Sequence, residues 1–209
     1  MATRALLPLL DREALFVRRW QMLKPGASAK ARQEAELTLK RLLARTRDQW
    51  QPEIVSGLFP AKIAVPRLTI RVGRRRAVLN VSAGFRQRLK QRWGLQRFLV
   101  GVQVVTMGSN VVKEAHRLAK TGNIHEQFLL HGLAAELTEA LAVYSQRQIA
   151  KLAGWKESRR YSPGYPVLPE LADQRAIFRL LNPKRIGVRL TRSFQMVPEY
   201  STSAILIEK

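Results

Sequence analysis

The chain has 209 residues, 46% of them apolar, and carries 37 Lys and Arg against 15 Asp and Glu, a formal net charge of +22. The apolar content excludes a disordered chain, and the length fits a single domain spanning 1–209. With no cysteine, disulfides, thiolate metal sites and a cysteine nucleophile are excluded. No apolar run reaches the roughly 18–20 residues of a membrane span, so we expect no membrane partner.

The positive charge predicts attraction of polyanions and acidic proteins, with nucleic acid as the generic partner. The arginines are spread from end to end, with one dense run at residues 74–76. A solvated basic surface therefore accounts for most of them equally well. No helix-turn-helix, aromatic RNA-binding strand or Cys/His finger organises a nucleic-acid contact. Nucleic acid stays open as a partner on charge alone.

The first half of the chain predicts helical and extended segments in alternation. Residues 1–10 are weakly leader-like but are treated as part of the fold. Helix formers, alternating apolar residues and Pro or Gly breaks define the elements. In chain order we expect a buried entry segment at residues 8–23, a break at 24–26 and a helix at 27–50. A turn at 56–60, a hairpin at 67–81 and a short helix at 82–93, capped by Ser82, follow.

The second half predicts a central strand, three helices and two further strands. Ser109 is expected to cap the first of these helices, and apolar residues from Phe128 to Tyr144 at helical spacing predict a core stripe on the second. Strands and helices without regular βαβ alternation predict an α+β fold. The central strand falls at residues 98–106, the three helices at 111–120, 125–152 and 169–181, and the two further strands at 186–193 and 202–207.

Residues 159–196 form the most informative segment, in which a basic residue leads into a tight Pro-Gly turn and an aromatic residue follows the glycine directly. Gly164 can adopt positive φ and exposes its backbone, while Pro163 and Pro166 stiffen the loop. Arg160 offers a planar fork that recognises a carboxylate. A rigid loop of this kind suits a small polar ligand. An ordinary turn between two elements is the alternative that the loop by itself favours.

This segment resembles the S-adenosylmethionine-binding loop of the activation domain of cobalamin-dependent methionine synthase. In that family an Arg-x-x-x-Gly-Tyr-Pro run precedes a helix and a Gly-x-x-Leu-Thr-x-Ser-x-x-Met strand, as residues 160–196 do here. Residues 55–61, 78–87 and 137–144, and Asp11 with Phe16, are similar to further family segments in the same order. The resemblance implies a twisted antiparallel β-sheet flanked by helices.

By this resemblance Asp11 and Glu139 accept hydrogen bonds from the ammonium group or ribose hydroxyls of S-adenosylmethionine, and offset its sulfonium charge. Arg160 clamps the methionyl carboxylate. Considered without the family, Asp11 is more readily a helix or turn cap, and Glu139 a surface charge beside the core stripe.

The resemblance also implies that Ser162 and Gly164 offer backbone groups to the ligand. Tyr165 is implied as the catalytic residue, which faces the corrin ring of a partner and helps to displace its lower axial ligand. The protein is then a component of a methyltransferase that supports reductive methylation, or reactivation, of cob(II)alamin. An acidic flavodoxin-like donor would supply the electron, and the basic surface would speed their encounter. We expect a cytoplasmic location.

Cobalamin is expected to come only from a separate methionine synthase chain, because the cofactor-binding Asp-x-His-x-x-Gly motif is absent from the sequence. The three histidines, His116, His125 and His131, are expected to be surface or helix residues and not metal ligands. Family members usually run beyond the position of Lys209 and add one more ligand-contacting aromatic. We therefore expect a weaker affinity, or a site that a partner completes.

Two other functions compete with reactivation. One is a basic RNA- or ribonucleoprotein-binding protein that keeps the fold with a vestigial pocket. The other is a sensor of S-adenosylmethionine without a redox role. The charge favours the first. The joint presence of Asp11, Glu139, Arg160, Gly164 and Tyr165 weighs against it.

Overall fold

The computed structural model describes residues 2–209 except 25, 47–48, 65–66, 74 and 95. The predicted break at Pro25 and the predicted turn residue Arg74 fall outside these residues. The helices are α1 (Ala29–Thr46), α2 (Ala83–Trp93), α3 (Ser109–Lys120), α4 (Ile124–Ala153) and α5 (Gln174–Leu181). Short 3-10 or π segments are η1 (Thr3–Leu9), η2 (Ala14–Arg19), η3 (Leu171–Asp173) and η4 (Pro183–Ile186).

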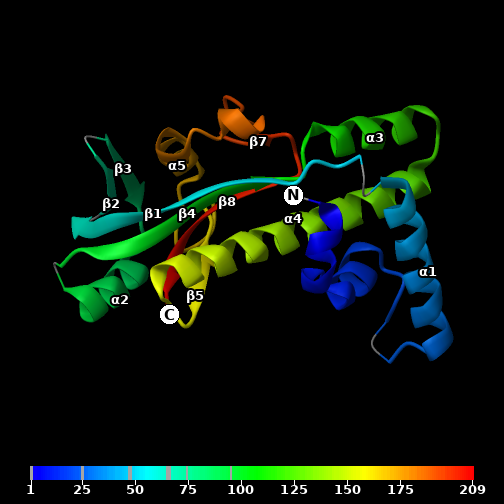
Figure 1. Ribbon diagram of the computed structural model, residues 1–209, viewed down its shortest axis with the longest axis horizontal. Coiled ribbons are helices and arrows are strands. Elements are labelled where there is room, and N and C mark those ends of the chain that lie inside the picture. The colour runs from blue at the N-terminus through cyan, green and yellow to red at the C-terminus, as the bar shows by residue number, and fades with distance from the viewer. Residues whose placement is uncertain (1, 25, 47–48, 65–66, 74, 95) are drawn as a thin grey trace.

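Six of the strands form one antiparallel sheet in the order β3-β2-β1-β4-β8-β5, and β6 pairs with β7. Figure 1 shows this long, twisted sheet with α4 running along one side and α5 on the other. The predicted α+β architecture is confirmed. The strands are β1 (Glu53–Ala64), β2 (Arg67–Val72), β3 (Arg75–Asn80), β4 (Phe98–Thr106), β5 (Ser158–Tyr161), β6 (Arg189–Leu190), β7 (Met196–Val197) and β8 (Ser201–Glu208).

The central strand β4 divides the core into two layers, because side chains alternate between the faces of a strand. Val100, Val102 and Val104 point toward α2 and α5, where they are fully buried in one apolar cluster. On the other face Val105 joins the cluster formed with α1, α3 and α4. The Gln103 Nε2 donates to the Ala142 carbonyl at 3.3 Å, which ties α4 to this face.

Most predicted elements are confirmed to within a few residues. The hairpin 67–81 is β2 and β3, the central strand is β4, and the long helix is α4. Ser82 caps α2, its hydroxyl accepting from the Phe85 N–H. η1 packs against the α1–α3–α4 cluster through Leu6, which is fully buried, so the leader-like residues are part of the fold.

The turn predicted at 56–60 is wrong, because these residues lie inside β1. Over residues 53–60 β1 pairs with β4 alone, so its other edge is open and tolerates Pro60. Gly57 is needed for a different reason. The ring of Phe59 lies over it, and a Cβ at Gly57 would approach the Phe59 Cζ to 2.4 Å.

Four smaller predictions also need correction. The Ser109 cap is wrong: Ser109 is the first residue of α3 and Gly108 is the capping position, with no side-chain cap. Phe128 was expected in the core stripe of α4 but is 42% exposed. The strand predicted at 186–193 shrinks to β6, because η4 occupies its start and Thr191 turns the chain by accepting from the Phe194 N–H. The helix predicted from residue 169 begins at Leu171, as η3.

Strands β5 and β7 are additions that periodicity did not predict, since each has four residues or fewer. In the part of the chain that the structure describes, no helix combines the length and apolar character needed to cross a bilayer.

Candidate ligand-binding site

Arg160 is positioned by β5, the edge strand of the sheet. It lies opposite Leu206 of β8, and its neighbour Arg159 points the other way and is exposed. The alternation directs Arg160 toward α4, where its Nη2 forms an ion pair with the Glu139 Oε2. The structure therefore brings together two residues that are 21 positions apart in the sequence and that the resemblance assigned to one pocket.

The second terminal nitrogen of Arg160, Nη1, is buried and has no hydrogen-bond partner among the residues that the structure describes. A buried cationic N–H without a partner is costly, about 1–3 kcal/mol or more. The Arg160 side chain is only 23% exposed, so solvent satisfies it poorly. Nη1 is therefore the terminal nitrogen left to contact an anionic oxygen, such as that of a carboxylate, once the side chains that cover it move.

The loop after β5 is held from both sides. The Gly164 N–H donates to the Leu168 carbonyl at 2.8 Å, and the Ser82 N–H donates to the Val167 carbonyl at 3.0 Å. Gly164 has a φ of +88°, and a Cβ there would lie 3.2 Å from the Leu171 side chain. Glycine therefore fits this position for two reasons, its positive φ and the close approach of Leu171.

This geometry bears on the loop residues implied as ligand contacts. The Gly164 N–H is already occupied by the Leu168 carbonyl. Gly164 as a residue is exposed. Ser162 is half-buried directly after β5. Tyr165 is 67% exposed, a large aromatic side chain directed away from the core.

A hollow of about 220 Å³ adjoins Glu139 between α4 and the start of β8. Thr138 and Glu139 line it from α4, and Ser201 and Thr202 line it from β8. Glu199 adds a second carboxylate at its rim. Hydroxyl groups and carboxylates in one hollow suit a ligand that carries hydroxyl and ammonium groups.

Arg19 of η2 closes the hollow on a further side and pairs with a second acid of α4. Its Nε donates to the Glu136 Oε1 at 2.7 Å, and Glu136 is 6% exposed. Glu136 and Glu139 are three positions apart, so both lie on the same face of α4. Two Arg–Glu pairs thus stand side by side at this part of the helix.

Tyr200 forms the floor of the hollow at the end nearest His131. It is 5% exposed, and its Oη lies 3.0 Å from the His131 Nδ1. Burial, with a smaller contribution from the nearby Glu199 carboxylate, raises the pKa of Tyr200 to about 12. The phenol is therefore a neutral hydrogen-bonding group at physiological pH.

Asp11 caps the start of a helical segment, as expected when the sequence is considered without the family resemblance. Its Oδ1 accepts from the Ala14 N–H at 2.8 Å at the start of η2. Its Oδ2 lies 3.6 Å from the Arg18 Nη2, and the Asp11 side chain is 58% exposed. Asp11 does not line the hollow beside Glu139.

Sequence reasoning missed the residues that surround Glu139 in the hollow. Glu136 carried a usable signal, because an acid three positions before Glu139 shares its helix face. The others come from η2, from β8 and from the two residues before β8. They had no local signal, since only the packing of these segments against α4 brings them together. These are Arg19, Glu199, Tyr200, Ser201 and Thr202.

Among the described residues no group of three or more His, Asp or Glu side chains could hold a metal ion. The three histidines lie on helices, His116 on α3 and His125 and His131 on α4.

Comparison with known proteins identifies a family model that matches nearly the whole chain and relatives that match half of it. Residues 21–209 match the family model for the activation domain of vitamin B12-dependent methionine synthase. The methionine synthase of Mycobacterium tuberculosis is 31% identical over 126 residues, which cover 50% of this chain and 11% of that protein. The methionine synthase of Mycobacterium leprae is 29% identical over 126 residues, with 50% and 10% covered. The matched region is thus about a tenth of the length of these relatives.

The fold also matches a solved structure. A crystal structure described as the MetH reactivation domain bound to AdoHcy superposes with a TM-score of 0.82 at 19% sequence identity, covering 100% of this chain and 76% of the other. The twisted antiparallel sheet with flanking helices is common to both.

Proposed function

The chain belongs to the family of activation domains of vitamin B12-dependent methionine synthase, and we propose that it binds S-adenosylmethionine and supports reactivation of a cobalamin-dependent methionine synthase. The similar MetH reactivation domain is described as bound to AdoHcy, the product left when S-adenosylmethionine loses its methyl group. The observation that carries the proposal is the buried, unpartnered Nη1 of Arg160 beside Glu139.

The residues present fit the amino-acid end of this ligand. Arg160 donates from Nη1 to the methionyl carboxylate, a charge-assisted contact that satisfies its buried N–H. Glu139, already held by Arg160 Nη2, orients its carboxylate toward the ammonium group. Glu139 and Glu199 at the hollow also provide negative charge near the sulfonium within a strongly basic protein.

Ser162 and the Gly164 carbonyl are proposed as backbone contacts, since the loop that holds them is fixed by hydrogen bonds at Gly164 and Val167. Asp11 is proposed as a further contact through Oδ2, because Oδ1 is occupied by the Ala14 N–H. An exposed acid at this position would reach a ribose hydroxyl or the ammonium group only after Arg18 gives way.

When bound, S-adenosylmethionine would supply a methyl group to the cobalt of a cobalamin held by a partner chain, and an acidic flavodoxin-like protein would supply the one electron that cob(II)alamin needs first. This chain's own contribution is positioning, which makes the transfer effectively unimolecular. Tyr165, 67% exposed at the tip of the fixed loop, is proposed to meet the corrin face of the partner.

Calorimetric titration with S-adenosylmethionine tests the site. Arg160→Ala is expected to weaken binding by about 1.5–3 kcal/mol, roughly tenfold or more, through loss of a charge-assisted contact. Arg159→Ala is the matched control, because it removes the same charge from the adjacent residue on the opposite face of β5. Its affinity is expected to stay within about twofold of the wild type. Equal losses in both variants, or no heat with wild type at millimolar ligand, would contradict the proposal.

A further inference from the structure

The net positive charge of the chain is concentrated in one stretch because acidic residues are missing there, although the arginines themselves are spread along the chain. Between Glu53 and Glu114 the sequence has no acidic residue and 12 Lys and Arg, more than half of the net charge of +22. Most of these residues belong to the end of β1, to β2, β3 and α2, which lie together at one end of the sheet in Figure 1.

Strand register places several of these cations on one face. Lys62 of β1 lies opposite Thr69 of β2, and Arg71 of β2 lies opposite Arg76 of β3. Ala61 pairs with Phe98 of β4, so Arg97 continues the row beside Lys62. Ala61, Ile70 and Phe98 are buried on the other face, which is packed against the core.

This basic face is uncovered because α4 ends before it. Farther along β4, Gly101 and Gln103 on the same face contact α4 through Ile149 and Ala142. Beyond Gly101 the face continues as Leu99, which is 42% exposed, and then as Arg97. The sheet thus extends past its covering helix and presents cationic side chains to solvent.

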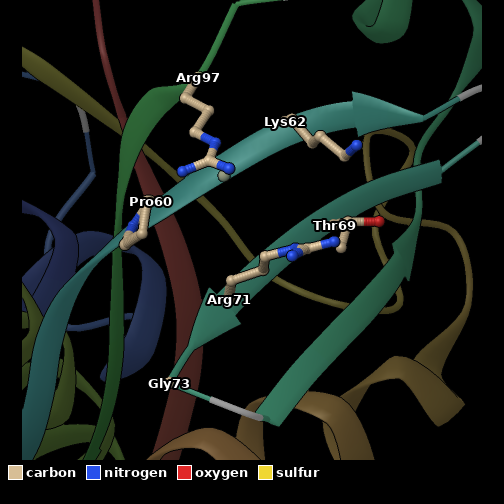
Figure 2. Close-up of a pocket in the computed structure, with 7 residues that line it drawn as sticks. Pro60, Lys62, Thr69, Arg71, Gly73 and Arg97 are labelled. Atoms are coloured by element: carbon tan, nitrogen blue, oxygen red, sulfur yellow. The ribbon is translucent and has the colours of Figure 1, made fainter.

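A pocket of about 250 Å³ lies on this face, lined by Lys62, Thr69, Arg71, Gly73 and Arg97 with neighbouring backbone. Figure 2 shows the side chains of Lys62, Arg71 and Arg97 on one side of the β1–β2 ribbon, each coming from a different part of the sheet. Within the described part of the chain no acidic side chain forms an ion pair with any of these three cations. By contrast, Arg12, Arg19, Arg32, Arg41, Arg45, Arg92, Arg117 and Arg160 all have acidic partners.

Like charges that lie directly opposite each other on a sheet are destabilising. Arg71 and Arg76 are such a pair, and Lys62 and Arg97 add to the same field. No fold requirement accounts for this arrangement, because all of these side chains point away from the core. An anion seated between them would offset the repulsion and gain charge-assisted hydrogen bonds from lysine and arginine together.

We propose that this face is a nucleic-acid-binding surface, with the Lys62–Arg71–Arg97 pocket seating a backbone phosphate. Arg76 of β3 extends the row of cations on this face beyond the pocket, and a row longer than one small phosphate favours a polyanion. The pocket has no aromatic lining residue on which a base could stack. Contacts are therefore with phosphates, and binding is independent of sequence.

The test uses fluorescence anisotropy with a labelled DNA duplex of about 20 base pairs, titrated with the full chain between about 50 and 200 mM KCl. The variant is Lys62→Gln/Arg71→Gln/Arg97→Gln. The control is Lys30→Gln/Lys40→Gln/Lys120→Gln, three exposed cations on α1 and α3. Each triple change lowers the net charge by three, so the two variants match in overall charge.

The pocket variant is expected to bind the duplex at least about tenfold more weakly than wild type, with a slope of log affinity against log salt smaller by about 0.9, since the pocket seats one phosphate and each neutralised phosphate contributes about 0.9. The control is expected to change both quantities little. Because the pocket variant relieves like-charge repulsion, its melting temperature should equal or exceed that of wild type. If it does not fold, the single change Lys62→Gln, at an exposed position, is expected to weaken duplex binding more than the single change Lys40→Gln does.

Three outcomes overturn the proposal. The first is an equal loss of affinity in both triple variants, which would show that only overall charge acts. The second is equal competition by poly-L-glutamate, which would make the surface a docking site for acidic proteins. The third is binding of pyrophosphate at the pocket without any binding of the duplex. Loss of S-adenosylmethionine binding in the Arg160→Ala variant, with duplex binding unchanged, would keep this inference separate from the proposed function.

Discussion

Arg160 is fixed by one of its terminal nitrogens, while the other has no hydrogen-bond partner among the described residues. The fixed nitrogen is Nη2, on Glu139, and the other, Nη1, is buried. A guanidinium cannot lose its charge in a protein, so the free N–H keeps its demand for an acceptor. Under the proposed function, this cost would be recovered when the methionyl carboxylate binds. Asp11 differs, since its Oδ1 already accepts from the backbone of η2.

Tyr200 gives a pH-dependent prediction at the same scale. Its pKa is raised to about 12, mainly by burial, against about 10 in the unfolded chain. The neutral phenol therefore contributes stability that is complete below about pH 10 and is lost as the pH rises to about 12. We expect the free energy of unfolding of wild type, relative to Tyr200→Phe, to fall across this window.

Urea unfolding of the two proteins at several pH values measures this difference, and Tyr200→Phe should also remove the highest-pH step from the phenolate absorbance titration. The contact with His131 contributes a loss in Tyr200→Phe that is present at lower pH as well. A stability difference that stays constant between about pH 10 and 12 would show that burial does not hold the phenol neutral.

At the scale of elements, the site depends on how closely α4 approaches the sheet. Gly101 of β4 allows this approach, because a Cβ there would lie 2.5 Å from the Ile149 Cγ2 and 3.1 Å from the Leu206 Cβ. The same helix carries Glu136 and Glu139 toward Arg19 and the sheet edge. On the opposite face Asp173 fixes α5 to β3 by accepting from the Asn80 N–H at 2.5 Å.

Gly101→Ala is therefore expected to destabilise the protein by about 1–3 kcal/mol, because the added methyl group overpacks the α4–sheet contact. Gly84→Ala is the matched control. Gly84 lies in α2 with no atom within 4 Å of an added Cβ, and its replacement should stabilise the helix by up to about 1 kcal/mol. Chemical denaturation measures both changes. Equal, small effects of the two substitutions would mean that α4 does not need the close approach at Gly101.

At the scale of the whole molecule, the two proposed sites occupy different parts of one sheet. The ligand site lies where α4 covers the sheet, between Glu139 and β8. The basic face lies past the end of α4, around Lys62 and Arg97. Carboxylates are concentrated at the first and absent from the second. One molecule with a net charge of +22 can therefore hold a cationic ligand and an anionic one.

Tyr165 gives a prediction at this scale, because it is exposed and needs a partner to act on. Tyr165→Ala is expected to leave the affinity for S-adenosylmethionine within about threefold of wild type, since the loop is held by Gly164 and Val167 instead. It should abolish recovery of a cob(II)alamin-inactivated methionine synthase that lacks its own activation domain. Recovery is measured as methionine formed in the presence of ligand and reductant.

Leu152→Ala is the control for this assay, because Leu152 is a large apolar side chain that is 73% exposed elsewhere, on α4. It should leave recovery unchanged. Full recovery with Tyr165→Ala would exclude a role for this side chain at the corrin face, and failure of wild type to restore the enzyme would exclude reactivation by this chain.

Local sequence determined the elements whose signals are complete within one segment. The alternation of Leu68 and Ile70 specified the hairpin, and the long apolar stripe through Leu133, Leu137 and Leu141 specified α4. The prediction of a turn at residues 56–60 was wrong because the structural roles of Gly57 and Pro60 depend on residues outside this segment. A ring lies over Gly57, and the edge beside Pro60 is open.

The sequence by itself therefore determined the fold class and the family resemblance, since family motifs and periodicity are local properties of a chain. It proposed Glu139 and Arg160 as members of one pocket, and the structure showed that these two side chains pair. The tertiary structure alone decided which residues surround Glu139, that Asp11 caps η2, and that an acid-free stretch emerges on a face without a helix over it. These facts depend on strand register and on where α4 ends. Both are set by contacts between residues far apart in the sequence, which no local pattern encodes.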